Sequence, residues 1–127
     1  KGIDLQWKSI KRSEYLSNTI VVRDGSGSMT WSYLSSVLPI DVATSLAILL
    51  SEQLTGPFKD TFITFSANPK LVKLAPGTLY DKVLQTKAYD ECSNTDIAKV
   101  YKLLLKVALS NKVKYFSKAF SYSLCSR

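Results

Sequence analysis

The chain has 127 residues, of which 46% are hydrophobic and 21% charged; this composition fits one globular domain and excludes collagen, a coiled coil and general disorder. No apolar run approaches the roughly 20 residues that span a bilayer, and the absence of histidine excludes a Ser/His catalytic pair and His-ligated zinc within the chain. The formal net charge of +7 arises after Asp96, where lysines and one arginine follow without any acid.

The first third of the chain predicts a strand, a loop and a helix. Residues 1–17 are polar with scattered apolar positions, and we expect a short helix or a lead-in there. The β-branched run 18–23 predicts a strand, which the glycines and serines of residues 24–29 end in a tight loop. Residues 39–54 begin with proline and predict a largely buried helix. Its expected inward residues are Ala43, Leu46, Ala47, Leu50 and Leu54.

The remaining elements predict an α/β sheet with one antiparallel hairpin. Residues 61–65 and 71–74 predict two strands, and the short turn between them favours antiparallel pairing. Amphipathic helices are predicted over residues 78–86 and 96–109, and a last strand over residues 112–116. The expected inward residues are Leu79, Val83 and Leu84 on the first helix, and Ile97, Val100, Tyr101, Leu104 and Ala108 on the second.

The loop after the first strand carries a carboxylate and two hydroxyls at alternate positions, Asp24, Ser26 and Ser28. Such hard oxygen ligands favour Mg²⁺, Mn²⁺ or Ca²⁺ over zinc. The loop follows the carboxyl end of a strand, where open α/β sheets place their ligands. The alternative interpretation is a turn whose side chains accept hydrogen bonds from nearby backbone N–H groups.

Residues 20–29, Ile-Val-Val-Arg-Asp-Gly-Ser-Gly-Ser-Met, resemble the strand and metal-ion-dependent adhesion site loop of von Willebrand factor type A domains. Residues 39–47, 62–69 and 94–101 resemble successive blocks of the DUF2828 group of intracellular A-domain proteins. The resemblance implies a partial, Rossmann-like three-layer fold with a mainly parallel sheet and one antiparallel hairpin. It also implies a partial A-like domain over 18–120 that lacks later elements of the fold; we expect residues 1–17 to be a lead-in and residues 121–127 an unpatterned tail.

The resemblance further implies that Thr95 adds a third hydroxyl to Asp24, Ser26 and Ser28 around Mg²⁺, with Mn²⁺ or Ca²⁺ as substitutes. The second acidic position of the family corresponds to Lys118, whose ammonium group repels a cation where a carboxylate would attract it. We therefore expect weak Mg²⁺ binding. From the missing later elements of the fold we also expect the chain to be a fragment of a longer protein.

The leading functional hypothesis is a non-enzymatic protein-binding module, in which an acidic side chain of a partner completes the coordination of the cation. Trp31 and Tyr33 are candidates for the rim of that binding surface. A Mg²⁺-dependent hydrolase ranks lowest, since it needs a general base for which only Asp41 and Asp96 stand nearby in the sequence.

The nucleic-acid alternative rests on the basic C-terminal region. The simpler interpretation of that region is the solvated face of a lysine-rich helix. The lysines concerned are Lys99, Lys102, Lys106, Lys112 and Lys114. Cys92 and Cys125 match no zinc or thioredoxin spacing, so we interpret them as free thiols of a reducing compartment and expect an intracellular protein.

Overall fold

A computed structural model of the chain describes residues 2–10, 16, 19–32, 36–91, 94 and 96–110. The predicted strand over 112–116 and the tail lie outside these residues, whereas every other predicted helix and strand is present. In chain order the elements are helix α1 (Gly2–Ser9), strand β1 (Val21–Arg23), 3₁₀ helix η2 (Gly27–Thr30), helix α2 (Pro39–Gln53), 3₁₀ helix η3 (Gly56–Phe58), strands β2 (Thr61–Thr64) and β3 (Leu71–Lys73), and helices α3 (Leu79–Lys87) and α4 (Ile97–Ser110).

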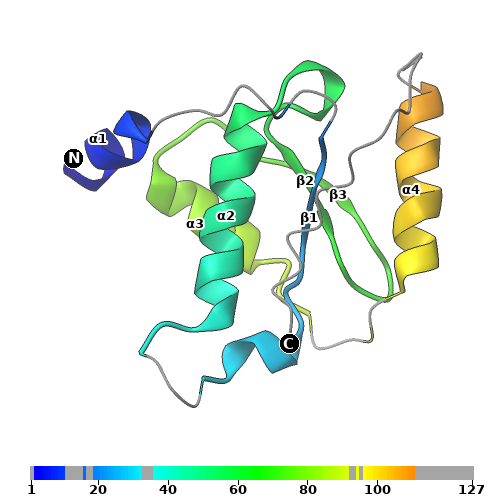
Figure 1. Cartoon of the computed structure of the whole chain (residues 1–127), viewed down its shortest axis with the longest axis horizontal. Helices are drawn as coiled ribbons and strands as arrows, with labels where there is room; N and C mark the ends of the chain where they lie inside the picture. The colour runs from blue at the N-terminus through cyan, green and yellow to red at the C-terminus, as the bar shows by residue number, and fades with distance from the viewer. Residues whose placement is uncertain are drawn as a thin grey trace.

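The three strands form one mixed sheet in the order β1-β2-β3 (Figure 1). β1 and β2 are parallel, with Val22 opposite Ile63, and α2 provides the crossover connection that a parallel pair requires. β2 and β3 are antiparallel, with Phe62 opposite Val72. The predicted α/β class and its antiparallel hairpin are thereby confirmed.

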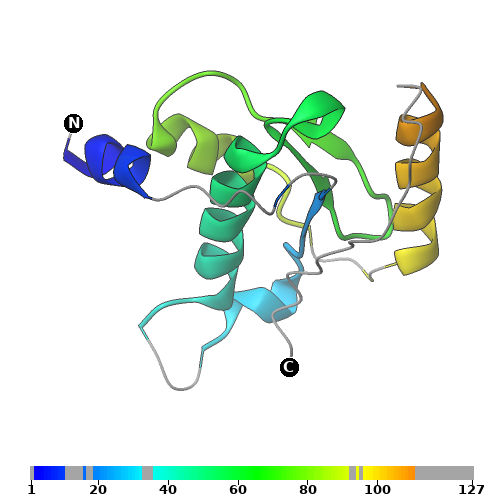
Figure 2. The same ribbon diagram turned by 45° about the horizontal axis from the view of Figure 1, so that its top comes forward.

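Helices cover both faces of the sheet because neighbouring residues of a strand face opposite sides. Val21 and Phe62 pack with Ile48 of α2 on one face, and α3 packs beside α2 on that side. Ile20 and Ile63 pack with Leu104 of α4 on the other face. Figures 1 and 2 show the resulting layers, with α2 and α3 on one side of the strands and α4 on the other.

The buried face of α2 differs from the predicted one. Ala47 is buried and Leu50 packs against the core as predicted, but Leu46 is only half-buried, and two hydroxyl residues, Thr44 and Ser51, are buried. Ser51 Oγ donates a hydrogen bond to the carbonyl oxygen of Thr61 at 2.9 Å, and Thr44 Oγ1 accepts one from a side chain of β1. These hydrogen bonds explain the difference, since an apolar pattern does not mark polar residues that are satisfied inside the core.

The inward faces of α3 and α4 are narrower than predicted. Val100, Leu104 and Ala108 are buried as expected, but Ile97 and Tyr101 are exposed. The buried stripe extends toward Leu103, which packs against the same core cluster as Leu104, so Tyr101 is left at the opposite edge of the stripe. On α3, Leu79 and Val83 pack against the core, whereas Leu84 is exposed, so its predicted inward position is wrong.

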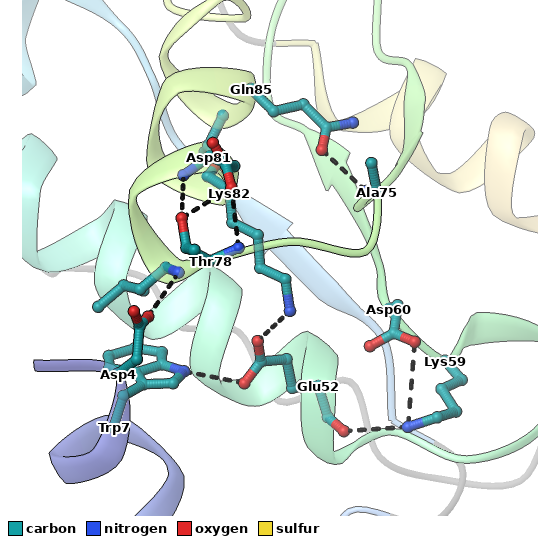
Figure 3. A network of polar contacts seen from close by, with 12 residues as sticks. Asp4, Trp7, Glu52, Lys59, Asp60, Ala75, Thr78, Asp81, Lys82 and Gln85 are labelled. Atoms are coloured by element: carbon teal, nitrogen blue, oxygen red, sulfur yellow. Dashed lines mark hydrogen bonds and ion pairs between the residues drawn. The ribbon is translucent and has the colours of Figure 1, made fainter. Parts of the chain in front are cut away.

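A network of polar contacts attaches α1 to the other helices (Figure 3). Trp7 Nε1 donates a hydrogen bond to Glu52 Oε2 of α2 at 2.9 Å, and Glu52 also forms an ion pair with Lys82 of α3. Asp4 Oδ1 accepts a hydrogen bond from the backbone N–H of Leu79 at 3.0 Å. The N-terminal segment is therefore a helix held against α2 and α3.

Helix α3 begins with a capping box. Thr78 Oγ1 accepts a hydrogen bond from the backbone N–H of Asp81 at 3.2 Å, and Asp81 Oδ2 accepts one from the backbone N–H of Thr78 at 2.9 Å. The side-chain and backbone hydrogen bonds that Thr78 donates to this carboxylate hold the pKa of Asp81 below its ordinary value.

Among the described residues, no helix is long and apolar enough to cross a membrane.

Candidate functional site

The loop over residues 24–28 leaves the sheet at the carboxyl end of β1. The backbone N–H of Phe65 donates a hydrogen bond to the carbonyl oxygen of Arg23 at 2.8 Å, so β1 and β2 end level with each other. Asp24 is the first residue beyond this edge, and 3₁₀ helix η2 begins at Gly27. The sheet thus places the loop where parallel α/β structures hold ligands.

The structure brings together three of the four predicted metal ligands. Asp24 Oδ1 accepts a hydrogen bond from the backbone N–H of Ser26 at 2.9 Å, and the hydroxyl oxygens of Ser26 and Ser28 are 3.0 Å apart. Asp24 and Ser26 are half-buried and Ser28 is exposed, so solvent reaches the cluster. The fourth predicted ligand, Thr95, lies outside the described residues.

These contacts also belong to an Asx turn, in which an aspartate side chain accepts the N–H two residues ahead. The backbone N–H of Met29 then donates to the carbonyl oxygen of Ser26 at 3.0 Å and starts η2. One turn therefore fixes the backbone, holds the Asp24 carboxylate against the N–H of Ser26 and sets the hydroxyl oxygens of Ser26 and Ser28 close together. The same hydrogen bonds serve the structural interpretation and the ligand interpretation.

The oxygen atoms of the cluster suit a hard cation, and the side chains that carry them supply little negative charge. One carboxylate and two hydroxyls are oxygen ligands of the kind that Mg²⁺ and Mn²⁺ accept. Within the described part of the chain, no three His, Cys, Asp or Glu side chains are grouped so that they could hold a metal ion. Asp24 is the single formal charge among its three described oxygen side chains, which fits weak binding better than tight binding.

Arg23, the residue directly before the loop, is a buried polar residue that the sequence analysis did not single out. Its side chain is buried, and Nη2 donates a hydrogen bond to Thr44 Oγ1 at 2.9 Å and forms an ion pair with Asp90. Nη1 lies 3.5 Å from the carbonyl oxygen of Thr86. The available signal was an arginine at a strand position that alternates with Val21, and therefore faces the same buried side.

The predicted basic surface is only partly described. Lys99, Lys102 and Lys106 lie on α4 and are exposed, whereas Lys112 and Lys114 lie outside the described residues. Lys99 Nζ donates a hydrogen bond at 2.9 Å to a carbonyl oxygen in the β2–β3 turn, and it lies 4.0 Å from the carboxylate of Asp96. One lysine of the set is thus engaged within the fold.

The two acids proposed as general bases have structural roles. Asp96 Oδ1 accepts a hydrogen bond from the backbone N–H of Lys99 at 3.2 Å and so caps α4. Asp41 lies in the first turn of α2, 3.9 Å from Lys87 Nζ. Of the two predicted rim aromatics, Trp31 is exposed and Tyr33 lies outside the described residues.

The fold and the loop define an α/β domain with a cluster of oxygen ligands at the carboxyl edge of its sheet. The profile of the DUF7788 family, a domain of unknown function, matches residues 18–117, and the chain belongs to this family. The chain is also 31% identical over 116 residues to "Uncharacterized protein L728" of Acanthamoeba polyphaga mimivirus, with 88% of this chain aligned. It spans 19% of that relative's length. No solved structure matches the chain.

Proposed function

We propose that the chain is a non-enzymatic, intracellular protein-binding module of the von Willebrand factor A type. Its loop holds a divalent cation weakly, and an acidic side chain of a protein partner completes the coordination. The observation that carries this proposal is the loop at the carboxyl end of β1, where Asp24 Oδ1 accepts a hydrogen bond from the N–H of Ser26 and the hydroxyls of Ser26 and Ser28 lie 3.0 Å apart. The sheet order supports it, because a parallel pair followed by an antiparallel edge strand agrees with the fold that the resemblance implies.

Asp24 contributes the negative charge, and the two serine hydroxyls contribute neutral oxygens. Mg²⁺ keeps several water ligands in such sites and accepts further carboxylate oxygens readily. A bound Mg²⁺ would leave the loop with a positive charge excess that attracts a carboxylate. A partner carboxylate then supplies the second charge that the chain lacks at Lys118.

A binding role also agrees with the surroundings of the loop. Asp96 and Asp41, the two candidate general bases, are engaged in other contacts: Asp96 caps α4, and Asp41 forms an ion pair with Lys87. These contacts give both acids a role in the fold that does not require catalysis. The nucleic-acid alternative is weaker, because Lys99 is held by the β2–β3 turn and by Asp96.

Calorimetric titration with Mn²⁺ and Mg²⁺ tests the cation site, with Asp24→Asn as the test variant. Asparagine keeps an oxygen that can accept from the N–H of Ser26, so the turn persists while the charge is lost. We expect binding to vanish in Asp24→Asn. The matched control is Asp60→Asn, which removes one charge at the amino end of β2, at the opposite edge of the sheet.

Asp60 has a backbone φ of 57°, a conformation that asparagine tolerates well, so the control should fold normally. Equal heats of Mn²⁺ and Mg²⁺ binding for the wild type and Asp24→Asn would contradict the cation site. The alternative is tested by salt: phosphate contacts weaken steeply as salt rises, whereas cation-bridged binding is abolished by a chelator.

A further inference from the structure

We infer that the ion pair between Arg23 and Asp90 positions the 24–28 loop, so that these two side chains are positioning residues for the proposed cation site. The inference rests on the proposed function for its consequence and on the described contacts for its geometry. Arg23 directly precedes Asp24, and Asp90 follows α3, so the pair joins the loop to a distant part of the chain.

The guanidinium group of Arg23 contacts three residues, on α2, on α3 and in the segment after α3. Nη2 donates to Thr44 of α2 and to Asp90, and Nη1 faces the carbonyl oxygen of Thr86 near the end of α3. The side chain of Arg23 is 1% exposed and that of Asp90 is 33% exposed. The arginine is therefore locked inside the helical layer, and its partner lies at the surface of that layer.

The loop backbone rests directly on this ion pair at Gly25. A Cβ atom at Gly25 would lie 2.7 Å from Arg23 Nη1 and 3.4 Å from Asp90 Oδ1. The carbonyl oxygen of Gly25 accepts a hydrogen bond from the backbone N–H of Glu91 at 3.2 Å. A side chain at position 25 would therefore force the guanidinium group to move away from its partners Thr44, Thr86 and Asp90.

Asp90 is itself held in place by the end of α3. Its backbone N–H donates to the carbonyl oxygen of Lys87 at 3.1 Å, and the neighbouring Tyr89 packs edge-on against Phe62 with ring centroids 6.4 Å apart. The carboxylate therefore has a defined position relative to the sheet. Because Asp90 is fixed, the guanidinium group is fixed, and the backbone between Asp24 and Ser26 takes its place from both.

Amide hydrogen exchange of the metal-free protein tests this role without relying on cation binding. Asp90→Asn removes the charge, and we expect the amides of residues 25–28 to exchange about tenfold faster while those of β2 keep their protection. Asp90→Glu keeps the charge and should restore most of the protection. Unchanged loop exchange in Asp90→Asn, or equal acceleration of loop and β2 amides, would overturn the inference.

Glu52→Gln is the matched control, since Glu52 forms a partly buried ion pair with Lys82 between α2 and α3, away from the loop. It should leave exchange in residues 25–28 as in the wild type. If Asp90→Asn does not fold, Gly25→Ala replaces it, because the added methyl group collides with Arg23 Nη1. Loop amides that stay as protected as the wild type in Gly25→Ala would also overturn the inference.

Mn²⁺ titration separates this inference from the proposed function. Loss of a residue that orients metal ligands typically weakens binding by about 10–100-fold, and we expect a loss of that order in Asp90→Asn but not in Glu52→Gln. A wild type that binds no Mn²⁺ would refute the cation site while the exchange experiment still decides the positioning role. Wild-type binding that Asp90→Asn leaves unchanged would refute the positioning role alone.

Discussion

Arg23 and Thr44 are joined by a 2.9 Å hydrogen bond from Nη2 to Oγ1, which connects the end of β1 to helix α2 inside the packed layer. A guanidinium group stays charged at every physiological pH, so its burial requires partners that accept hydrogen bonds. Thr44 is one of these partners, and it occupies a face of α2 where an apolar residue would ordinarily pack. The hydroxyl is therefore part of the core and of the support of the loop.

Replacement of Thr44 by valine should destabilise the domain. Valine has nearly the same shape but cannot accept the hydrogen bond from Arg23, and hydrogen bonds to charged groups are worth about 1.5–3 kcal/mol. We expect the free energy of unfolding to fall by that amount in urea denaturation. Thr44→Ser retains the hydroxyl, so its free energy of unfolding should fall clearly less. Equal denaturation midpoints for the valine variant and the wild type would contradict the role of this contact.

Leu104→Ala should lower the free energy of unfolding by about 2–5 kcal/mol, because a buried leucine that packs with Ile20 and Ile63 is truncated. Leu105→Ala, at an exposed position on the same helix, should change it by no more than about 0.5 kcal/mol. Leu46→Ala should lie between them, since Leu46 is half-buried. Chemical denaturation of the three variants measures this order. A loss of stability in Leu105→Ala as large as that in Leu104→Ala would contradict the observed orientation of α4.

The capping box predicts a specific acid dependence of stability. Hydrogen bonds from Thr78 hold the pKa of Asp81 below its unfolded value, so the folded state is favoured while this group is ionised. That contribution is complete above the ordinary aspartate pKa of about 3.9 and is lost as the pH falls through the lower folded value. Melting temperatures measured between neutral and acidic pH should therefore fall less in Asp81→Asn than in the wild type.

Thr78→Ala removes the same cap and should cost about 0.5–2 kcal/mol at neutral pH. The neighbouring exposed position Tyr80 offers a control, because Tyr80→Ala removes surface area without touching the cap. Identical acid profiles for the wild type and Asp81→Asn would show that the capping hydrogen bonds do not contribute to stability.

Lys118→Asp should strengthen Mn²⁺ and Mg²⁺ binding, because it replaces a repelling ammonium by a carboxylate at the position that the resemblance assigns to an acid. Calorimetry of the full chain measures the change. Lys102→Asp, which alters net charge equally on the exposed side of α4, is the control and should have little effect. An unchanged affinity in Lys118→Asp would remove Lys118 from the site.

Hydrophobic periodicity predicted the elements well, because β1, α2, β2, β3 and α4 each carry a clear apolar pattern. It predicted the orientation of α2 less well. The side chains that decide this orientation include Thr44 and Ser51, whose hydroxyls are satisfied by partners on β1 and β2. A pattern that counts only apolar residues cannot register them.

The candidate site was predictable to a similar degree. The alternation of Asp24, Ser26 and Ser28 is local, so a short loop is enough to place the three side chains on one turn, whereas their predicted role as metal ligands stays a prediction. The support beneath them was not predictable, because Arg23 meets Asp90 from 67 positions away along the chain. Such a pairing depends on how α3 packs, which no short motif contains.

That sequence separation also has a kinetic consequence. The β2–β3 hairpin pairs Ile63 with Leu71, so little chain must be closed to form it, whereas closing the segment between Arg23 and Asp90 costs about 2 kcal/mol more in chain entropy. Because this entropy is lost before the distant contact forms, we expect the Arg23–Asp90 pair to form after the hairpin. Pulse-labelled hydrogen exchange should find β2 protected before Ser26, and the reverse order would contradict this sequence of events. A nascent domain would thus acquire its hairpin first and its binding competence last.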